Sequence, residues 1–280
     1  AGSLEVPDHI TLWGLRLKIC QHFDQYANVR PSRLLPGIQS PLKNIGPAEL
    51  DWVIVRENTE GEYSGAGGRV HPKLPQEVGI DVSVFTRDGI ERVMRYAFEL
   101  ALTRPKKQLT LVTKSNAQRH GMVLWDEVFE KLKHDYPGIT TDRMLVDAIT
   151  TRMVLQPQSL DTIVATNLHA DILSDLAAAL SGSLGIGPTA NINPERTFPS
   201  MFEPIHGSAF DLVGKDLANP LGAFWSCVMM LEHLQENKGA SLLMSAIEEV
   251  CQEGRHLPKD LGGNSCTGEV TTAVCAALKK

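Results

Sequence analysis

Short apolar runs alternate with amphipathic stretches through the middle of the chain. Three times, an apolar run ends in a polar residue and leads into a segment with helical spacing. These runs cover residues 108–114, 143–147 and 160–167 and end in Lys114, Asp147 and Asn167. Alternating strands and helices are typical of an α/β fold whose sheet has parallel character.

The first third of the chain carries mixed signals. Apolar residues around 12–23 recur at helical spacing, and the stretch that follows contains Pro31 and Pro36 and is expected to be extended. Residues 52–55 predict a buried strand that ends in Arg56 and Glu57. Residues 71–84 alternate like one arm of a hairpin, and Thr86 is a suitable N-cap for a helix over 87–104.

The last third is expected to be mainly helical. Glycines interrupt residues 181–192, which favours a helix end followed by a loop. Residues 202–220 have no regular period and predict a long loop. Three helices are expected at the end of the chain, with Ser265 or Thr267 as the cap of the last one; they cover residues 221–234, 240–254 and 268–280.

Candidate chemistry gathers at the predicted strand ends. In parallel sheets, ligands bind outside the carboxyl ends of the strands, where Lys114, Asp147, Asn167 and Asp171 all fall. Asp171 and Asp175 are four residues apart, so both carboxylates lie on one helix face and repel each other. A Mg²⁺ ion would compensate this repulsion. The alternative is a carboxylate favoured by the helix dipole and a second, solvated one.

The long loop at 202–220 offers a second candidate site. Its small residues and exposed amides could hold a phosphate or a ribose, and Asp211 could accept a hydrogen bond from a ribose diol.

Composition excludes several classes of function. The chain of 280 residues has a net charge of −6 and no basic block, so no nucleic acid is expected as a partner. No apolar run approaches the roughly 20 residues of a membrane helix, so no membrane partner is expected. Five cysteines without metal-ligand spacing favour free thiols in a reducing, cytoplasmic environment. The chain has no starting methionine and no signal peptide, which suggests a processed, partial or engineered chain.

Several segments together resemble a known enzyme family. NLHADILSD at 167–175, followed by GSLGIGP, is similar to the metal signature of the β-decarboxylating dehydrogenases, which include isocitrate and isopropylmalate dehydrogenases. VRENTEGEYSG, VTKSN and EPIHGSAFD are similar to other hallmarks, and the likeness is greatest to the tartrate and D-malate dehydrogenase branch. The resemblance runs from about Leu12 to the C-terminus.

This resemblance implies a fold and a domain division. The expected fold is isopropylmalate dehydrogenase-like: two α/β domains with parallel or mixed sheets, unlike a standard Rossmann fold. Residues 1–22 and 183–280 would form a large cofactor-binding domain that lacks the family's usual N-terminal strand. Residues 23–182 would form a small domain for substrate binding and dimerisation.

The resemblance also assigns roles to single residues. Tyr63 and Lys114 would be catalytic, as the donor of a proton to carbon and as the base for the 2-hydroxyl. Lys114 and Asp147 would come from the neighbouring subunit of a homodimer. Three groups would bind ligands: Arg16, Arg30 and Arg56 the substrate carboxylates, Asp147, Asp171 and Asp175 the metal, and His206, Gly207, Ser208, Ala209, Asp211 and Asn219 the cofactor.

The implied activity is oxidation and β-decarboxylation of a small 2-hydroxy dicarboxylic acid, dependent on NAD and on Mg²⁺ or Mn²⁺. The substrate would be D-malate, giving pyruvate and CO₂, or tartrate; whether K⁺ assists stays open. Trp13 either fills the substrate pocket or packs in the core. Alternatives are a 3-isopropylmalate dehydrogenase, an inactive truncated fragment or partner subunit, and, ranked lower, a Mg²⁺-dependent phosphate-ester enzyme.

Overall fold

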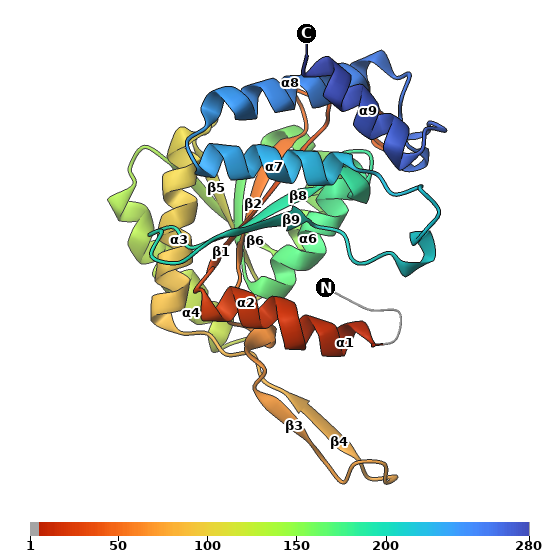
Figure 1. Cartoon of the computed structure of the whole chain (residues 1–280). Helices are drawn as coiled ribbons and strands as arrows, with labels where there is room; N and C mark the ends of the chain where they lie inside the picture. Colours follow the sequence, from red (N-terminus) through yellow and green to blue (C-terminus); the bar gives the residue numbers. More distant parts are fainter. Residues whose placement is uncertain (1–5, 280) are drawn as a thin grey trace.

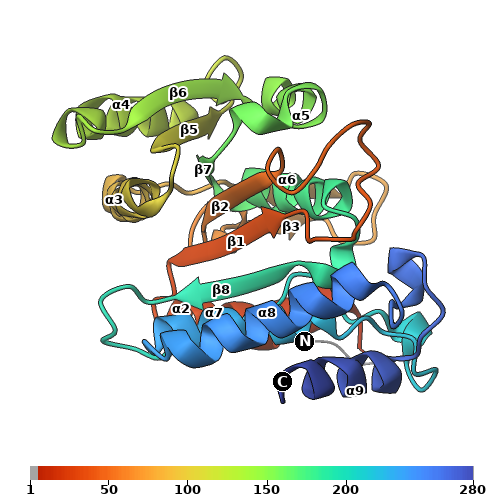
Figure 2. The same cartoon turned by 90° about the horizontal axis from the view of Figure 1, so that it is seen from above.

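A single mixed sheet of seven strands forms the centre of the molecule (Figures 1 and 2). The computed structural model describes residues 6–279, without the side chains of residues 8 and 9. The sheet order is β6-β5-β7-β2-β1-β8-β9. Strands β6, β5, β7 and β2 run parallel, whereas β1, β8 and β9 pair antiparallel. The bounds are β1 Ala27–Arg33, β2 Asp51–Glu57, β5 Gln108–Thr113, β6 Thr140–Leu145, β7 Thr162–Ala165, β8 Pro188–Ile192 and β9 Met201–Pro204.

Helices cover both faces of the sheet, as the α/β prediction requires (Figure 2). Helices α3 (Arg87–Thr103) and α4 (Gly121–Leu132) lie on one face, and α5 (Val146–Leu155) and α6 (Asn167–Leu180) lie on the other. The predicted cap of α3 is confirmed, because the Thr86 side chain accepts a hydrogen bond from the Gly89 amide. The two-residue period of β2 fits this layering: Ile54 belongs to the core cluster beneath α6, and Val55 to the one beneath α3.

Helices lie near the beginning and at the end of the described residues. The first stretch consists of α1 (Asp8–Thr11), a π-helical turn (Leu12–Arg16) and α2 (Leu17–His22). The three predicted C-terminal helices are confirmed as α7 Leu221–His233, α8 Asn237–Glu253 and α9 Thr267–Ala277. Helix α9 is capped by Cys266, whose side chain and amide form a reciprocal pair with Glu269, so both predicted cap residues were wrong.

Two sequence predictions fail for identifiable reasons. The strand expected to end in Asp147 ends at Leu145, and Asp147 is the second residue of α5. Residues 181–192, which were predicted as a helix end and a loop, contain strand β8. All five residues of β8 are buried, Thr189 and Asn191 included. Its residues alternate between apolar and polar, but the strand is short and directly follows a glycine-rich run, which favoured the interpretation as a loop.

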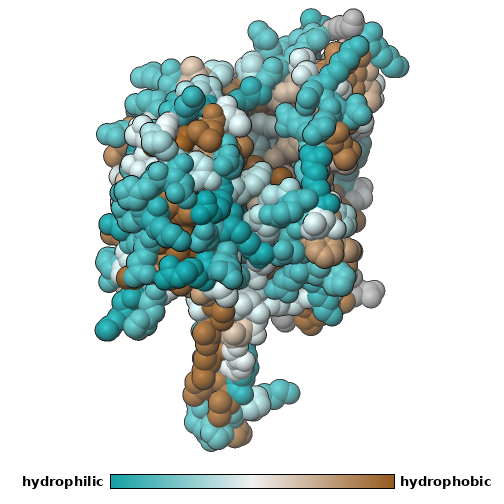
Figure 3. All heavy atoms as spheres, turned by 90° about the vertical axis from the view of Figure 1, so that its left-hand side faces the viewer, coloured by the Kyte–Doolittle hydropathy of each residue, from teal (hydrophilic) through white to brown (hydrophobic). Residues whose placement is uncertain are grey.

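A two-stranded hairpin projects from the body of the molecule (Figure 1) and confirms the predicted hairpin arm. It consists of β3 (Gly67–Val70) and β4 (Val78–Asp81). Val70, Val78 and Ile80 are each nearly half exposed, and Figure 3 shows apolar surface along the arm. An isolated hairpin of this kind is marginally stable at best in water.

Within the described residues, no helix is long and apolar enough to cross a membrane.

Candidate active site

Three arginines from separate elements meet in one pocket of about 400 Å³. Arg30 comes from β1, Arg56 from β2, and Arg16 from the end of the π-helical turn. Tyr63 and Asp171 line the same pocket. The structure therefore brings together all three predicted carboxylate-binding residues with the predicted proton donor and one predicted metal ligand. The remaining lining residues are Leu12, Thr189, Glu203, Pro204, Ile205, His206, Gly207 and Ser208.

The register of the sheet explains why these side chains converge. Asn28 on β1 lies opposite Arg56 on β2, and Arg30 follows Asn28 by two residues, so all three point to the same face. Helix α6 packs over that face. Its N-cap is Thr166, which accepts a hydrogen bond from the His169 amide and places Asp171 in the second turn above the two strands.

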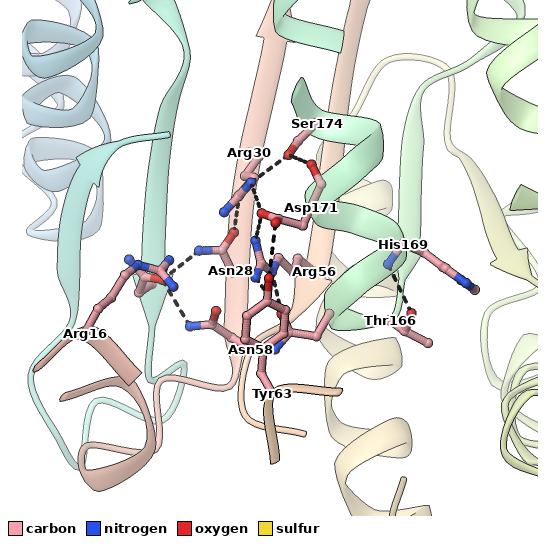
Figure 4. A network of polar contacts seen from close by, with 12 residues as sticks. Arg16, Asn28, Arg30, Arg56, Asn58, Tyr63, Thr166, His169, Asp171 and Ser174 are labelled. Carbon is pink, nitrogen blue, oxygen red and sulfur yellow. Dashed lines mark hydrogen bonds and ion pairs between the residues drawn. The ribbon is translucent and has the colours of Figure 1, made fainter. Parts of the chain in front are cut away.

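Asp171 is the negative centre of the pocket (Figure 4). Its Oδ1 accepts a hydrogen bond from Arg30 Nη1 at 3.1 Å and a second one from Arg56 Nη1. Burial alone would raise the pKa of Asp171, but the charges of Arg56 and Arg30 outweigh it and hold the pKa below its usual value. Burial lowers the pKa values of Arg30 and Arg56, so both guanidinium groups depend on this carboxylate.

Tyr63 stands beside this charge cluster. Its hydroxyl lies 3.4 Å from Asp171 Oδ2, and its ring centroid lies 5.4 Å from Arg56 Cζ. Burial, reinforced by the Asp171 charge, raises the pKa of Tyr63. The hydroxyl therefore keeps its proton near neutral pH, as a proton donor must.

Trp13 occupies neither of its two predicted positions. It is 39% exposed, so it is not in the core, and its ring stacks against Tyr63 with centroids 6.5 Å apart. Leu12, its neighbour, lines the pocket instead.

The predicted metal ligands are only partly assembled. Asp175 lies one helical turn after Asp171 at a more exposed position, and partial burial, with the Asp171 charge, raises its pKa. Arg30 and Arg56 neutralise the charge of Asp171, whereas Asp175 forms no ion pair among the described residues, and carboxylate oxygens suit a hard divalent cation. Asp147 is instead an exposed ion-pair partner of Lys114, and neither residue lines the pocket. Among the side chains that the structure describes, no three carboxylate, imidazole or thiol groups come together to hold a metal ion.

Four of the six predicted cofactor residues line a second pocket of about 600 Å³. His206 and Gly207 line both pockets and join them, whereas Ser208 lines only the first pocket. Ala209 and Asn219 line the second, and Asn219 Oδ1 accepts a hydrogen bond from the amide of Leu221 at the start of α7. Asp211 is exposed in a 3₁₀ turn and lies outside both linings.

Sequence reasoning missed the polar residues that support the arginines. Glu203 lies 2.8 Å from Arg16 Nε, and Asn28 Oδ1 accepts a hydrogen bond from Arg30 Nε at 2.7 Å. Burial lowers the pKa of Arg16, but Glu203 reverses this effect, so the pKa is raised. Ser174 accepts a further hydrogen bond from Arg30. Only Asn28 could have been found from the sequence. It lies two residues before Arg30 on a strand, so both side chains are on the same face.

Comparison with known proteins agrees with this geometry. The family profile described as isocitrate/isopropylmalate dehydrogenase matches residues 2–276. The chain belongs to the isocitrate/isopropylmalate dehydrogenase family. Its arginine pocket and carboxylate-bearing helix are thus parts of a dehydrogenase fold, and the family prediction from NLHADILSD is confirmed.

Individual members of the isocitrate/isopropylmalate dehydrogenase family show where this chain lies within it. A probable tartrate dehydrogenase/decarboxylase of Agrobacterium vitis is 66% identical over 99% of this chain and 77% of its own length. The D-malate dehydrogenase [decarboxylating] of Escherichia coli is 50% identical over 98% of this chain and 77% of its own length. The crystal structure of isocitrate dehydrogenase from Methylococcus capsulatus superposes with a TM-score of 0.90 at 35% identity, over 100% of this chain and 80% of that one.

Proposed function

We propose that this protein oxidises and decarboxylates a small 2-hydroxy dicarboxylic acid, with NAD as the hydride acceptor and Mg²⁺ or Mn²⁺ as the metal. D-malate and tartrate are the proposed substrates. The observation that carries the proposal is the convergence of Arg16, Arg30 and Arg56 with Tyr63 and Asp171 in one pocket, which joins a second pocket through His206 and Gly207. The names of the relatives from Agrobacterium vitis and Escherichia coli support the choice of substrates.

The arginines bind and orient the acid. Guanidinium groups pair with carboxylates through two parallel hydrogen bonds, so three arginines suffice for a dicarboxylate. Burial of Arg30 and Arg56 strengthens this attraction, because little water remains to screen their charges. Their present partner, Asp171, would turn towards the metal as the substrate carboxylate takes its place.

Two residues handle protons. Lys114 would remove the proton from the 2-hydroxyl while hydride leaves C2 for the nicotinamide. After loss of CO₂, Tyr63 would deliver a proton to the carbon that remains, and its raised pKa keeps that proton available. A divalent cation held by Asp171, Asp175 and Asp147 would act as a Lewis acid on the 2-oxygen.

A homodimer completes the proposed site. Lys114 and Asp147 of one subunit would serve the pocket of its partner, since within a single chain neither lines its own pocket. The apolar hairpin arm β3–β4 supports association, because such a ribbon gains stability when its faces are covered. The proposed domains are residues 1–22 with 183–280 for the cofactor, and residues 23–182 for substrate and dimerisation.

The test is an assay of NADH absorbance with NAD⁺ and Mn²⁺. D-malate, the tartrate isomers, 3-isopropylmalate and isocitrate are compared separately. Turnover of D-malate or tartrate that is lost in Asp171→Asn, but kept in the surface control Asp135→Asn, is the expected result. Turnover of only 3-isopropylmalate or isocitrate would keep the family and refute the substrate assignment. A folded, dimeric protein that is inactive with all of these acids would refute the proposal.

A further inference from the structure

A row of polar side chains crosses the sheet beneath the substrate pocket. In the register, Asn191 on β8 lies opposite Asn28 on β1, and Asn28 lies opposite Arg56 on β2. The three residues therefore share one face of the sheet. Asn28 and Asn191 are completely buried and Arg56 almost completely. Polar side chains buried to this degree need hydrogen-bond partners, and those partners define what Asn191 does.

The amide of Asn191 uses both of its ends. Its Oδ1 accepts hydrogen bonds from Asn28 Nδ2 at 2.7 Å, Asn58 Nδ2 at 3.0 Å and Arg16 Nη2 at 3.3 Å. Its Nδ2 donates to Glu203 Oε1 at 3.1 Å. The surrounding donors and the carboxylate acceptor allow only one orientation of the amide, because a flipped amide would present donors to donors.

These contacts link two of the substrate arginines. Arg16 is held from two sides, by Asn191 Oδ1 and by Glu203 Oε1, and Glu203 Oε1 itself accepts from Asn191. Arg30 is reached through Asn28, which donates to Asn191 with Nδ2 and accepts from Arg30 Nε with Oδ1. Figure 4 shows Asn28 and Asn58 directed towards Arg16. One buried amide thus connects guanidinium groups from a helical turn and from a strand.

We infer that Asn191 is a positioning residue that fixes Arg16 and Arg30 relative to each other. Two carboxylates of one small acid must meet two guanidinium groups at a set separation, and a fixed pair of arginines selects acids of matching length. The hydrogen bonds around Asn191 hold this separation before the acid binds, which lowers the ordering cost of binding. The inference rests on the proposed function for its substrate, but the positioning itself is a property of the free protein.

The test uses Asn191→Leu, because the leucine side chain is close in size to that of asparagine and has no polar atoms. The matched control is Asn193→Leu on the same chain segment. Asn193 is as buried as Asn191, but its side chain donates to the Asp24 carbonyl and accepts from the Thr197 and Phe198 amides, so it holds none of the pocket arginines. Both variants should lose stability. Only Asn191→Leu should raise the KM for the dicarboxylic acid, by about tenfold to a hundredfold, with the KM for NAD unchanged.

A second readout does not require turnover. The Nε–H signals of Arg16 and Arg30 in ¹H–¹⁵N NMR spectra, assigned with Arg16→Lys and Arg30→Lys, report on the two guanidinium environments. Both signals should shift in Asn191→Leu and stay in place in Asn193→Leu. If the leucine variant fails to fold, Asn191→Ser, which is too short to reach these partners, replaces it.

The outcomes separate the two proposals. An inactive wild-type protein whose arginine signals shift in Asn191→Leu would refute the proposed function and leave the positioning intact. If the wild-type protein is active and the Asn191 variant keeps both its KM for the acid and its arginine signals, the inference is refuted. Equal effects of the Asn191 and Asn193 variants on KM would assign Asn191 a purely structural role and would also refute the inference.

Discussion

Lys114 and Asp147 form an ion pair with each other, and neither of them lines the pocket that contains Asp171. Lys114 directly follows β5, and Asp147 lies in the first turn of α5, which follows β6. Strands β5 and β6 are parallel neighbours, so the register of the sheet explains their pairing. Since both residues are proposed to serve a partner's pocket, defects in Lys114 and in Asp171 should complement each other.

Complementation is the first prediction. Lys114→Ala and Asp171→Asn should each be inactive as homodimers. When the two are unfolded and refolded together, half of the dimers contain one chain of each kind, and each such dimer has one intact site. Activity should return to about a quarter of the wild-type value. Refolding each variant alone is the control, and a mixture that stays inactive would contradict the shared site.

The two carboxylates of α6 should affect stability with opposite signs. Asp171→Asn leaves the buried Arg30 and Arg56 without their carboxylate, and should lower the free energy of unfolding by about 2 kcal/mol. Asp175→Asn removes a repulsive charge and should raise the free energy of unfolding. The gain should be only a few tenths of a kcal/mol, because Asp175 is exposed and solvent screens its charge. Urea unfolding in the presence of EDTA measures both changes.

The metal provides the second half of this test. Added Mn²⁺ should stabilise the wild-type protein through binding to the native state and should have little effect on either variant. Stabilisation of Asp175→Asn by Mn²⁺ equal to that of the wild-type protein would remove Asp175 from the proposed ligands.

Glu57 gives a prediction about pH. Burial raises its pKa to about 6, although the Thr59 and Glu60 amides donate to the carboxylate. The native state therefore binds its proton more tightly than the unfolded state. This contribution to stability is complete below the unfolded pKa of about 4.3 and is lost as pH rises through about 6.

The effect is measurable in Glu57→Gln. Relative to the wild-type protein, the variant should gain about 2 kcal/mol in free energy of unfolding between pH 4 and pH 7.5. Chemical unfolding at both pH values tests this, with the surface substitution Glu127→Gln as the control. A difference between variant and wild type that stays constant with pH would contradict the assignment.

Asp211 should determine the choice of nicotinamide cofactor. A carboxylate beside the adenosine ribose accepts hydrogen bonds from a diol and repels a 2′-phosphate. Asp211→Ala should therefore raise the KM for NAD⁺ and lower the KM for NADP⁺, while kcat with the acid changes little. Steady-state kinetics with both cofactors checks this, and an unchanged ratio of the two KM values would show that the exposed Asp211 does not reach the ribose.

Local patterns predicted most of the fold and the charged part of the site. Helix α3 was predictable because its apolar face and Thr86 cap lie within one short segment. Arg30, Arg56 and Asp171 were identified through motifs, and their convergence follows from the antiparallel register of β1 and β2 beneath α6. Lys114 and Asp147 follow neighbouring parallel strands, but their distance from the pocket depends on strand order, which no local pattern contains.

The supporting residues could not be predicted in the same way. Asn191 lies in a short strand that directly follows a glycine-rich run, so its segment was predicted as a loop. Its partner Asn28 is distant in sequence, whereas Glu203 lies on the next strand, and the antiparallel pairing of β1, β8 and β9 brings all three together. Trp13 shows a different limit of the sequence. A large apolar residue close to Arg16 suggested that it fills the substrate pocket, but in the structure its ring stacks against Tyr63.

The sheet itself has a mechanical consequence for this site. Three residue pairs join β1 to β8, whereas seven join β1 to β2. The short β1–β8 ladder also separates the two proposed domains, which share one continuous sheet. A rotation of one domain against the other would flex the sheet along this line. The Asn28–Asn191 hydrogen bond crosses it, so the contacts that hold Arg16 and Arg30 at a set separation would also resist this rotation.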